Sequence, residues 1–139
     1  MEGMTPPENL PQISTVEGPA TFISCGGDVF LSYEVAPVEG AGVVILSFSD
    51  VVHFEKNPNN IHEGLRNSKY PVSPWGFTEI LGSDRNERWS HQFNPRRFWT
   101  ISFNDWTVEI VFSKIEKVFE TRESILPDVA LLEYLSKLR

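Results

Sequence analysis

The segment F-W-T-I-S-F-N-D-W-T-V-E-I-V-F, residues 98–112, decides the fold class, because apolar and polar residues alternate on both sides of Asn104-Asp105. If these two residues form a tight turn, Trp99 faces Ile110 across an antiparallel pair, and every pair on that face is apolar. The opposite face then pairs polar residues and carries Glu109 as an exposed side chain. A slip of one residue would mix the two faces, so the pattern predicts a β-hairpin in this register.

Three more strands are predicted upstream of the hairpin. Residues 20–25 and 29–35 are rich in apolar and aromatic residues and flank Gly26-Gly27, a turn pair that permits positive φ. Residues 43–48 form a nearly continuous apolar run, which is typical of a strand covered on both faces. The strand pattern then extends to Phe54.

The other segments before the hairpin are less regular. Residues 1–19 are rich in proline and predict an extended arm with little structure of its own. Residues 56–74 form the longest irregular stretch, with a short helix predicted over residues 61–66. Residues 75–81 predict a strand or a helical turn, and the polar residues 83–94 predict an irregular segment.

Beyond the hairpin, the second strand is expected to extend to Phe119, and residues 128–138 predict an amphipathic helix with Leu131, Leu135 and Leu138 on its apolar stripe. The sequence therefore predicts an α+β fold. A mainly antiparallel β-sheet of about six or seven strands, in a sandwich or a partly closed barrel, carries a C-terminal helix. Residues 20–139 are expected to form a single β-rich domain that follows the arm.

Length and composition fit one globular domain, since the chain has 139 residues, of which 40% are hydrophobic. No apolar run approaches the roughly 20 residues that span a bilayer, and the N-terminal residues do not resemble a secretory signal. We therefore expect no membrane association. The single cysteine, Cys25, is expected to be buried in its strand, and the absence of a disulfide pair favours a cytoplasmic location.

The charge is distributed unevenly along the chain. Residues 1–55 contain no Lys or Arg and carry a charge of −8, whereas residues 56–139 sum to +1. This acidity argues against a nucleic-acid partner, because phosphate contacts need Lys and Arg. It favours a basic protein partner, which an acidic surface could attract. The other interpretation is that the net charge only keeps the protein soluble.

The sequence contains no motif of a hydrolase, a metalloprotease or a phosphate-binding loop, so we expect no catalytic residue and no cofactor. One pattern nevertheless allows a metal or ligand site. His53 and Glu55 share one face of a strand, and His62 or His91 could complete a site for a divalent cation. The simpler interpretation is a polar surface cluster.

Residues 84–99 have the most unusual composition, with four arginines and two tryptophans among sixteen residues. Arg and Trp dominate the hot spots of protein interfaces, so the segment predicts a recognition surface. The other interpretation is that its arginines pair with the acidic N-terminal strands of the same chain. The candidate residues are Arg85, Arg88, Trp89, Arg96 and Arg97.

Four stretches carry a resemblance to a known pattern: Val52-His53-Phe54, Pro58–Leu65, Trp75 and Arg97–Glu109. They resemble a group of small bacterial proteins of uncharacterised function, with an H-F strand end, a P-N-x-x-x-H-x-x-L loop and a hairpin that reads R-H-F-x-F-x-F-H-D-S-T-F-E. The resemblance implies a bacterial, cytoplasmic protein and supplies no activity. This chain departs from the pattern at Trp99 and Asn104, where histidines are expected, which weakens a metal or catalytic interpretation.

The function we expect is that of a non-catalytic protein-binding module, most concretely an immunity- or antitoxin-like protein that binds a basic partner such as a toxin. Its partner-binding residues would be the arginine and tryptophan candidates above together with Glu34, Glu39 and Asp50. The alternative is a small-ligand or metal-binding β-domain with possible weak enzymatic activity. Its pocket would be lined by Trp75, Trp89, Trp99 and the arginine cluster. The proline-rich arm also leaves a homo-oligomer open.

Overall fold

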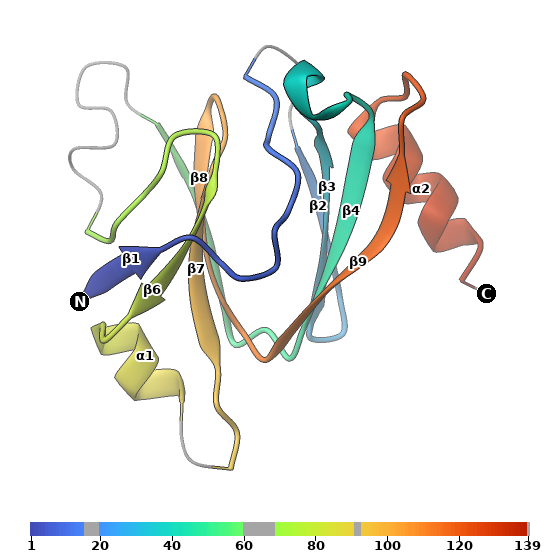
Figure 1. Cartoon of the computed structure of the whole chain (residues 1–139). Coiled ribbons are helices and arrows are strands. Elements are labelled where there is room, and N and C mark those ends of the chain that lie inside the picture. The colour runs from blue at the N-terminus through green and yellow to red at the C-terminus, as the bar shows by residue number, and fades with distance from the viewer. Residues whose placement is uncertain (16–19, 60–68, 91–92, 139) are drawn as a thin grey trace.

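The computed structural model describes residues 1–15, 20–59, 69–90 and 93–138. The described residues form nine strands, two α-helices and one short 3-10 helix, η1 (Figure 1). In chain order they are β1 (Glu2–Met4), β2 (Thr21–Cys25), β3 (Asp28–Glu34), η1 (Pro37–Glu39), β4 (Val43–Ser49), β5 (His53–Pro58), β6 (Phe77–Leu81), α1 (Asp84–Trp89), β7 (Arg97–Ser102), β8 (Trp106–Phe112), β9 (Lys114–Thr121) and α2 (Pro127–Ser136).

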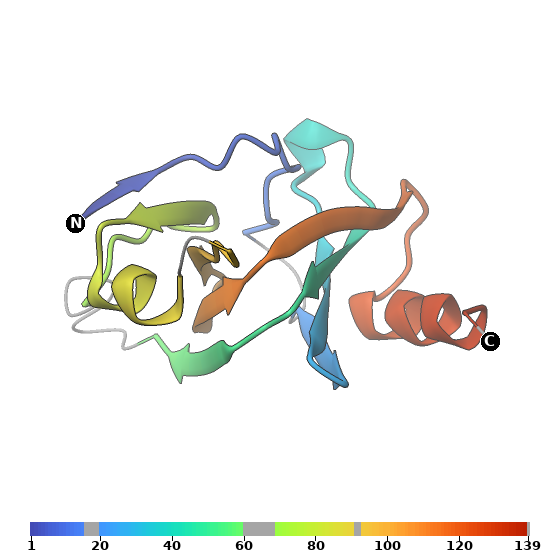
Figure 2. The same cartoon turned by 90° about the horizontal axis from the view of Figure 1, so that it is seen from below.

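The strands form two antiparallel sheets that pack as a sandwich and do not close into a barrel. The first sheet has the order β1-β6-β7-β8-β5, and the second has the order β2-β3-β4-β9. Only residues 50–52 separate β4 from β5, and only Ser113 separates β8 from β9. β4 pairs with β9, and β5 pairs with β8. The segments β4–β5 and β8–β9 therefore form one bent two-stranded ribbon that runs through both sheets (Figure 2).

The hairpin of β7 and β8 has the predicted register. Trp99 lies opposite Ile110, Thr100 lies opposite Glu109, and the Phe103 amide donates to the Trp106 carbonyl at 2.8 Å. The apolar face of the hairpin points into the core between the sheets, where Trp99 is completely buried. The fold class predicted from alternation is therefore confirmed, since each sheet contributes one apolar face to this core.

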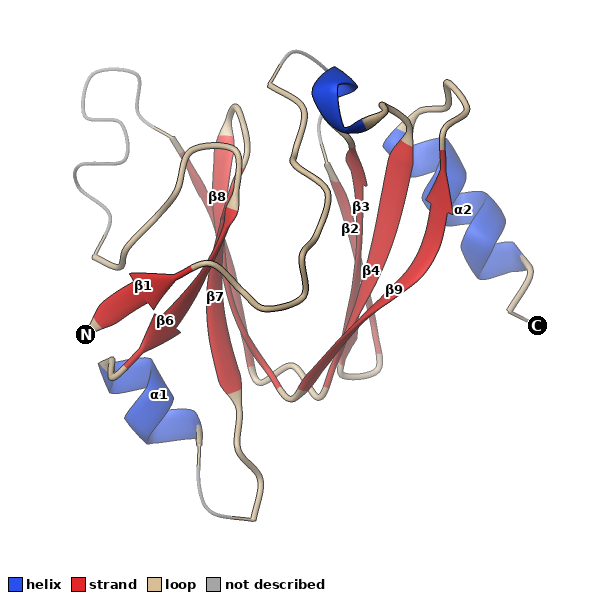
Figure 3. Ribbon diagram, viewed as in Figure 1, coloured by secondary structure: helices blue, strands red, loops and turns tan. Residues whose placement is uncertain are grey.

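The predicted strands before the hairpin are also present, and β4 is covered on both faces. Val44 and Phe48 face the core between the sheets, whereas Val43 and Ile45 pack against α2 on the other side. The chain then bends at Asp50, whose φ is +53°, so the predicted continuation of this strand is a separate element, β5. Figure 3 shows α1 and α2 on the outer faces of the two sheets.

The N-terminal residues cross from one sheet to the other (Figure 1). β1 pairs with β6 at the edge of the first sheet, and Ile13 forms a β-bridge with Val35 at the end of β3 in the second. Between these points Pro6 is buried, and the Tyr33 hydroxyl donates to the Pro11 carbonyl at 2.8 Å. The proline-rich segment is thus held against both sheets.

Three local expectations are wrong. Cys25 is exposed, because it ends an edge strand next to the turn and projects beyond the core. Glu109 is buried, because α1 covers that face of the hairpin. Residues predicted to be irregular form α1, which begins with a capping box in which Ser83 and Asn86 satisfy each other's backbone amides.

The C-terminal helix forms as predicted, although its apolar stripe is shorter. Leu131 is completely buried and Leu135 is partly buried against the second sheet, but Leu138 lies beyond the end of α2 and is exposed. The short helix predicted over residues 61–66 falls outside the described residues. Among the described residues, no helix is both long and apolar enough to cross a membrane.

Candidate functional site

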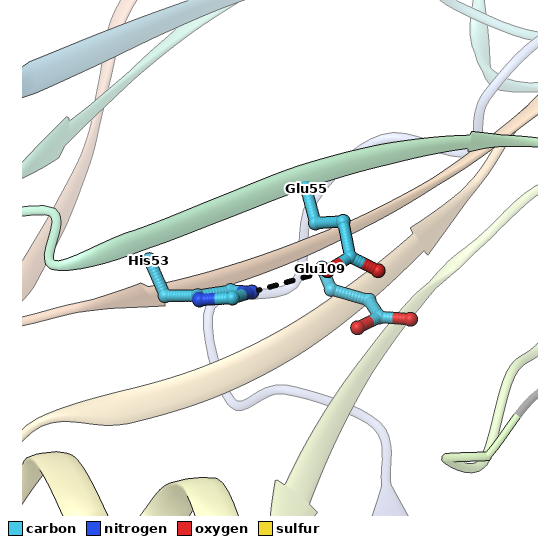
Figure 4. Close-up of side chains that lie close together, drawn as sticks. All are labelled: His53, Glu55 and Glu109. Atoms are coloured by element: carbon cyan, nitrogen blue, oxygen red, sulfur yellow. Dashed lines mark ion pairs between the residues drawn. The ribbon is translucent and has the colours of Figure 1, made fainter.

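The outer face of the first sheet carries a cluster of three polar side chains from β5 and β8 (Figure 4). His53 and Glu55 point to the same side of β5, as the sequence predicts, and Glu55 lies directly opposite Glu109 of β8. One ligand atom from each of the three residues lies within 4.8 Å of those of the other two. The sequence did not indicate Glu109 as a member of this cluster.

Arg85 of α1 reaches over this cluster and supplies a positive charge. Its guanidinium donates to Glu109, and its Nη2 lies 3.5 Å from Glu55 Oε1. The guanidinium also stacks over the rings of Tyr70 and Phe98, with 4.8 Å from Cζ to the Tyr70 centroid. The aromatic contacts and the cap of α1 therefore fix Arg85 in place over the two carboxylates.

Glu55 and His53 differ in the hydrogen bonds and charges that surround them. Asn57 donates to Glu55 Oε2 at 2.7 Å, and this hydrogen bond, with the charge of Arg85, lowers the pKa of Glu55. His53 Nε2 is buried and lacks a hydrogen-bond partner, and it lies 3.6 Å from Glu55 Oε1. Two buried or half-buried carboxylates thus share one arginine, beside a buried ring nitrogen whose contact with Glu55 is long.

Asp50 occupies a different place, the corner where the ribbon passes between the sheets. It accepts hydrogen bonds from Ser113 Oγ at 2.6 Å and from Arg96 Nε at 3.2 Å. These bonds, the one from Ser113 above all, lower the pKa of Asp50. Two of the predicted binding residues, Asp50 and Arg96, therefore contact each other within the chain.

Arg97 joins the N-terminal segment to the first sheet. Its guanidinium donates to both carboxylate oxygens of Glu8, at 2.7 and 2.8 Å, and its Nε donates to buried Glu79 at 3.0 Å. The charge also lies over the Trp99 ring, at 5.4 Å from the centroid. The bidentate geometry is the strong form of an ion pair, and the hydrogen bonds from Arg97 lower the pKa of Glu8.

Arg88 and Trp89 complete the predicted arginine-rich set. The Arg88 guanidinium stacks over the Trp89 ring at 5.0 Å, and Trp89 packs against an apolar cluster that includes Phe98. Trp89 and Trp99 therefore lie on opposite faces of the first sheet, and Trp75 lines a separate cavity of about 250 Å³ beside the N-terminal segment. The three tryptophans do not line a common pocket.

The acidic end is our name for Glu34, Glu39 and Glu120, which gather at one end of the second sheet. Glu34 ends β3, Glu39 lies in η1 just beyond it, and Glu120 lies near the end of β9. Glu39, Glu120 and Arg122 line a cavity of about 270 Å³. Burial raises the pKa of Tyr33, and the negative charges of Glu120 and Glu39 raise it further, so their field reaches into the fold.

His62 and His91, which the sequence offered as further ligands, lie outside the described residues. Comparison of the chain with protein-family models, curated proteins and solved structures finds no match.

Proposed function

We propose that this domain is a non-catalytic protein-binding module, and that its acidic end binds a basic protein in the way an immunity protein binds a basic toxin. The observation that carries the proposal is that three arginines of residues 84–99 pair with acids of the same chain, whereas the carboxylates of Glu39 and Glu120 lie at the surface. Arg85, Arg96 and Arg97 are engaged by acids of the same chain, as described above. Among the described residues, Glu39 and Glu120 of the acidic end lie near Arg122 and Lys117, and all four side chains are exposed.

The described contacts of Glu39 and Glu120 leave room for an external cation. Glu120 pairs with Lys117 at 3.2 Å, but both side chains are nearly half exposed, so this pair contributes little. Arg122 is the basic side chain that lines the cavity with Glu39 and Glu120. A Lys or Arg side chain of a partner that enters between the two carboxylates would leave water and gain two charge-assisted hydrogen bonds.

The filled core between the sheets also supports this proposal over an enclosed ligand site. Fourteen buried residues pack there, and Phe48, Trp99 and Phe112 contact one another edge to face at centroid distances of 4.9 to 5.7 Å. These rings fill the centre of the core. A cavity of about 340 Å³ remains beside it, lined by Phe22, Val29 and residues 51–54. Recognition would then take place at the surface.

The proposal predicts that a basic polypeptide binds through Glu39 and Glu120. Untagged protein, purified gently from the cells that produce it, should show a complex with a basic chain in native mass spectrometry. Recombinant wild-type protein should capture the same chain again, whereas the double variant Glu39→Gln/Glu120→Gln should lose about 90% of the complex at equal concentration.

The matched control is Glu87→Gln/Glu133→Gln, which removes the same charge from exposed positions on α1 and α2. This control should capture the partner as well as the wild type does. If the two double variants lose the complex equally, net charge alone would explain binding and the acidic end would have no special part. If both retain it, the binding surface lies elsewhere.

A further inference from the structure

The cluster of His53, Glu55 and Glu109 contains a pairing that is unfavourable in a β-sheet. Like charges directly opposite each other on neighbouring strands are destabilising, and Glu55 and Glu109 are such a pair. Arg85 compensates one of the two negative charges. The side chain of Glu109 is only 10% exposed, so solvent does little to screen what remains.

The histidine adds a second, independent observation. His53 Nε2 is inaccessible to solvent and lies 3.6 Å from Glu55 Oε1, within ion-pair range but too far for a good hydrogen bond (Figure 4). A buried polar atom that is poorly hydrogen-bonded costs free energy, so such atoms are rare in folded proteins. A cation placed among the three side chains would satisfy the ring nitrogen and the surplus negative charge together.

We propose that His53, Glu55 and Glu109 bind a divalent transition-metal ion of the Zn²⁺ type. One imidazole nitrogen and two carboxylate oxygens are ligands that Zn²⁺ accepts in proteins, and three protein ligands leave a fourth position for water. Mg²⁺ and Ca²⁺ prefer oxygen ligands alone, so the histidine selects against them.

The distances suit an ion that draws its ligands together. Bonds of about 2.1 Å to Zn²⁺ place tetrahedral ligand atoms about 3.4 Å apart. The three ligand atoms already lie within 4.8 Å of one another, so small side-chain rotations bring them into range. The β5–β8 pairing holds the backbones of all three residues, which keeps the ordering cost of binding low.

Neighbouring side chains orient the two carboxylates. Asn57 donates to Glu55 Oε2, which leaves Oε1 facing His53, and Arg85 donates to Glu109 Oε1. Metal-binding carboxylates are commonly held by outer hydrogen bonds of this kind. Arg85 and Asn57 are therefore positioning residues in this proposal.

Isothermal titration of the untagged full chain with Zn²⁺ tests the proposal. The wild type should bind one ion per chain, and His53→Ala and Glu55→Gln should each weaken binding at least about tenfold. Glu55 is 41% exposed in its side chain, so its variant should fold even if a change at buried Glu109 does not. Millimolar Mg²⁺ should not compete.

The other two histidines provide matched controls. His62→Ala and His91→Ala should bind Zn²⁺ within about twofold of the wild type, because the proposed site uses His53, Glu55 and Glu109 as its three protein ligands. Zn²⁺ binding that survives His53→Ala, or that is lost in either control instead, would overturn the proposal, and so would the absence of Zn²⁺ binding. The cluster lies on the first sheet and the acidic end on the second. The metal proposal can therefore fail without affecting the proposed binding of a basic protein.

Discussion

Replacement of Trp99 by alanine should lower the free energy of unfolding by about 4 kcal/mol, the largest loss we expect from any single side chain. Trp99 is completely buried between the sheets and contacts the rings of Phe48, Phe77 and Phe112. Its indole nitrogen also donates to Glu79 at 3.2 Å. The variant would therefore leave both a cavity and a buried carboxylate with one donor fewer.

Urea unfolding measures this loss directly, and Trp106→Ala is a suitable control. Trp106 is only partly buried at the start of β8, where Lys56 lies over its ring at 4.2 Å. Its replacement should cost about 1 kcal/mol, the order of one cation–π contact and partial burial. Equal losses in the two variants would contradict a core centred on Trp99.

Replacement of Arg97 by methionine should lower the free energy of unfolding by about 3 kcal/mol and release the N-terminal segment. Methionine keeps an unbranched side chain of similar length but leaves buried Glu79 without its partner charge. Glu8 loses both hydrogen bonds that tie its segment to the first sheet. Hydrogen exchange should therefore quicken at β1 before it quickens elsewhere.

Lys117→Met is the control for this second prediction, because it removes an exposed ion pair three residues apart on β9. Its cost should be below about 0.5 kcal/mol. Unchanged exchange at β1 in the Arg97 variant would show that the strand pairing of β1 with β6 holds the segment without Glu8.

The same contact should make the N-terminal segment sensitive to acid. The pKa of Glu8 in the folded protein lies below its ordinary value of 4.5, mainly because of the hydrogen bonds from Arg97. The stabilisation from this carboxylate is therefore present above pH 4.5 and is lost as the pH falls through the lowered pKa. The stability difference between wild type and Arg97→Met should accordingly shrink below about pH 4.

Local patterns allowed the sequence to predict the hairpin, and the absence of such patterns explains what it missed. Trp99 and Ile110 lie eleven residues apart, so turn chemistry and alternation fix their pairing. Glu55 and Glu109 meet only because β5 pairs with β8, a contact between distant segments that no local pattern specifies. Glu109 was therefore expected on an exposed face.

The arginine-rich segment shows why composition alone left two interpretations open. Its charge and aromatic content fit both a recognition surface and an internal partner for acids. The structure places Arg85, Arg96 and Arg97 in contact with Glu109, Asp50 and Glu8 of the same chain. The helix α1 that carries Arg85 was missed because its cap uses Asn86, where a Glu or Gln is the usual sequence signature.

The central proposal is that the acidic end attracts a basic protein, and the salt dependence of association tests it most directly. Association rates of the captured partner should be measured by stopped flow between low and physiological ionic strength. Wild type and Glu87→Gln/Glu133→Gln should slow steeply and in parallel as salt rises, whereas Glu39→Gln/Glu120→Gln should start about tenfold slower with a flatter slope. A slope in the Glu39→Gln/Glu120→Gln variant equal to that of the wild type would contradict the proposal.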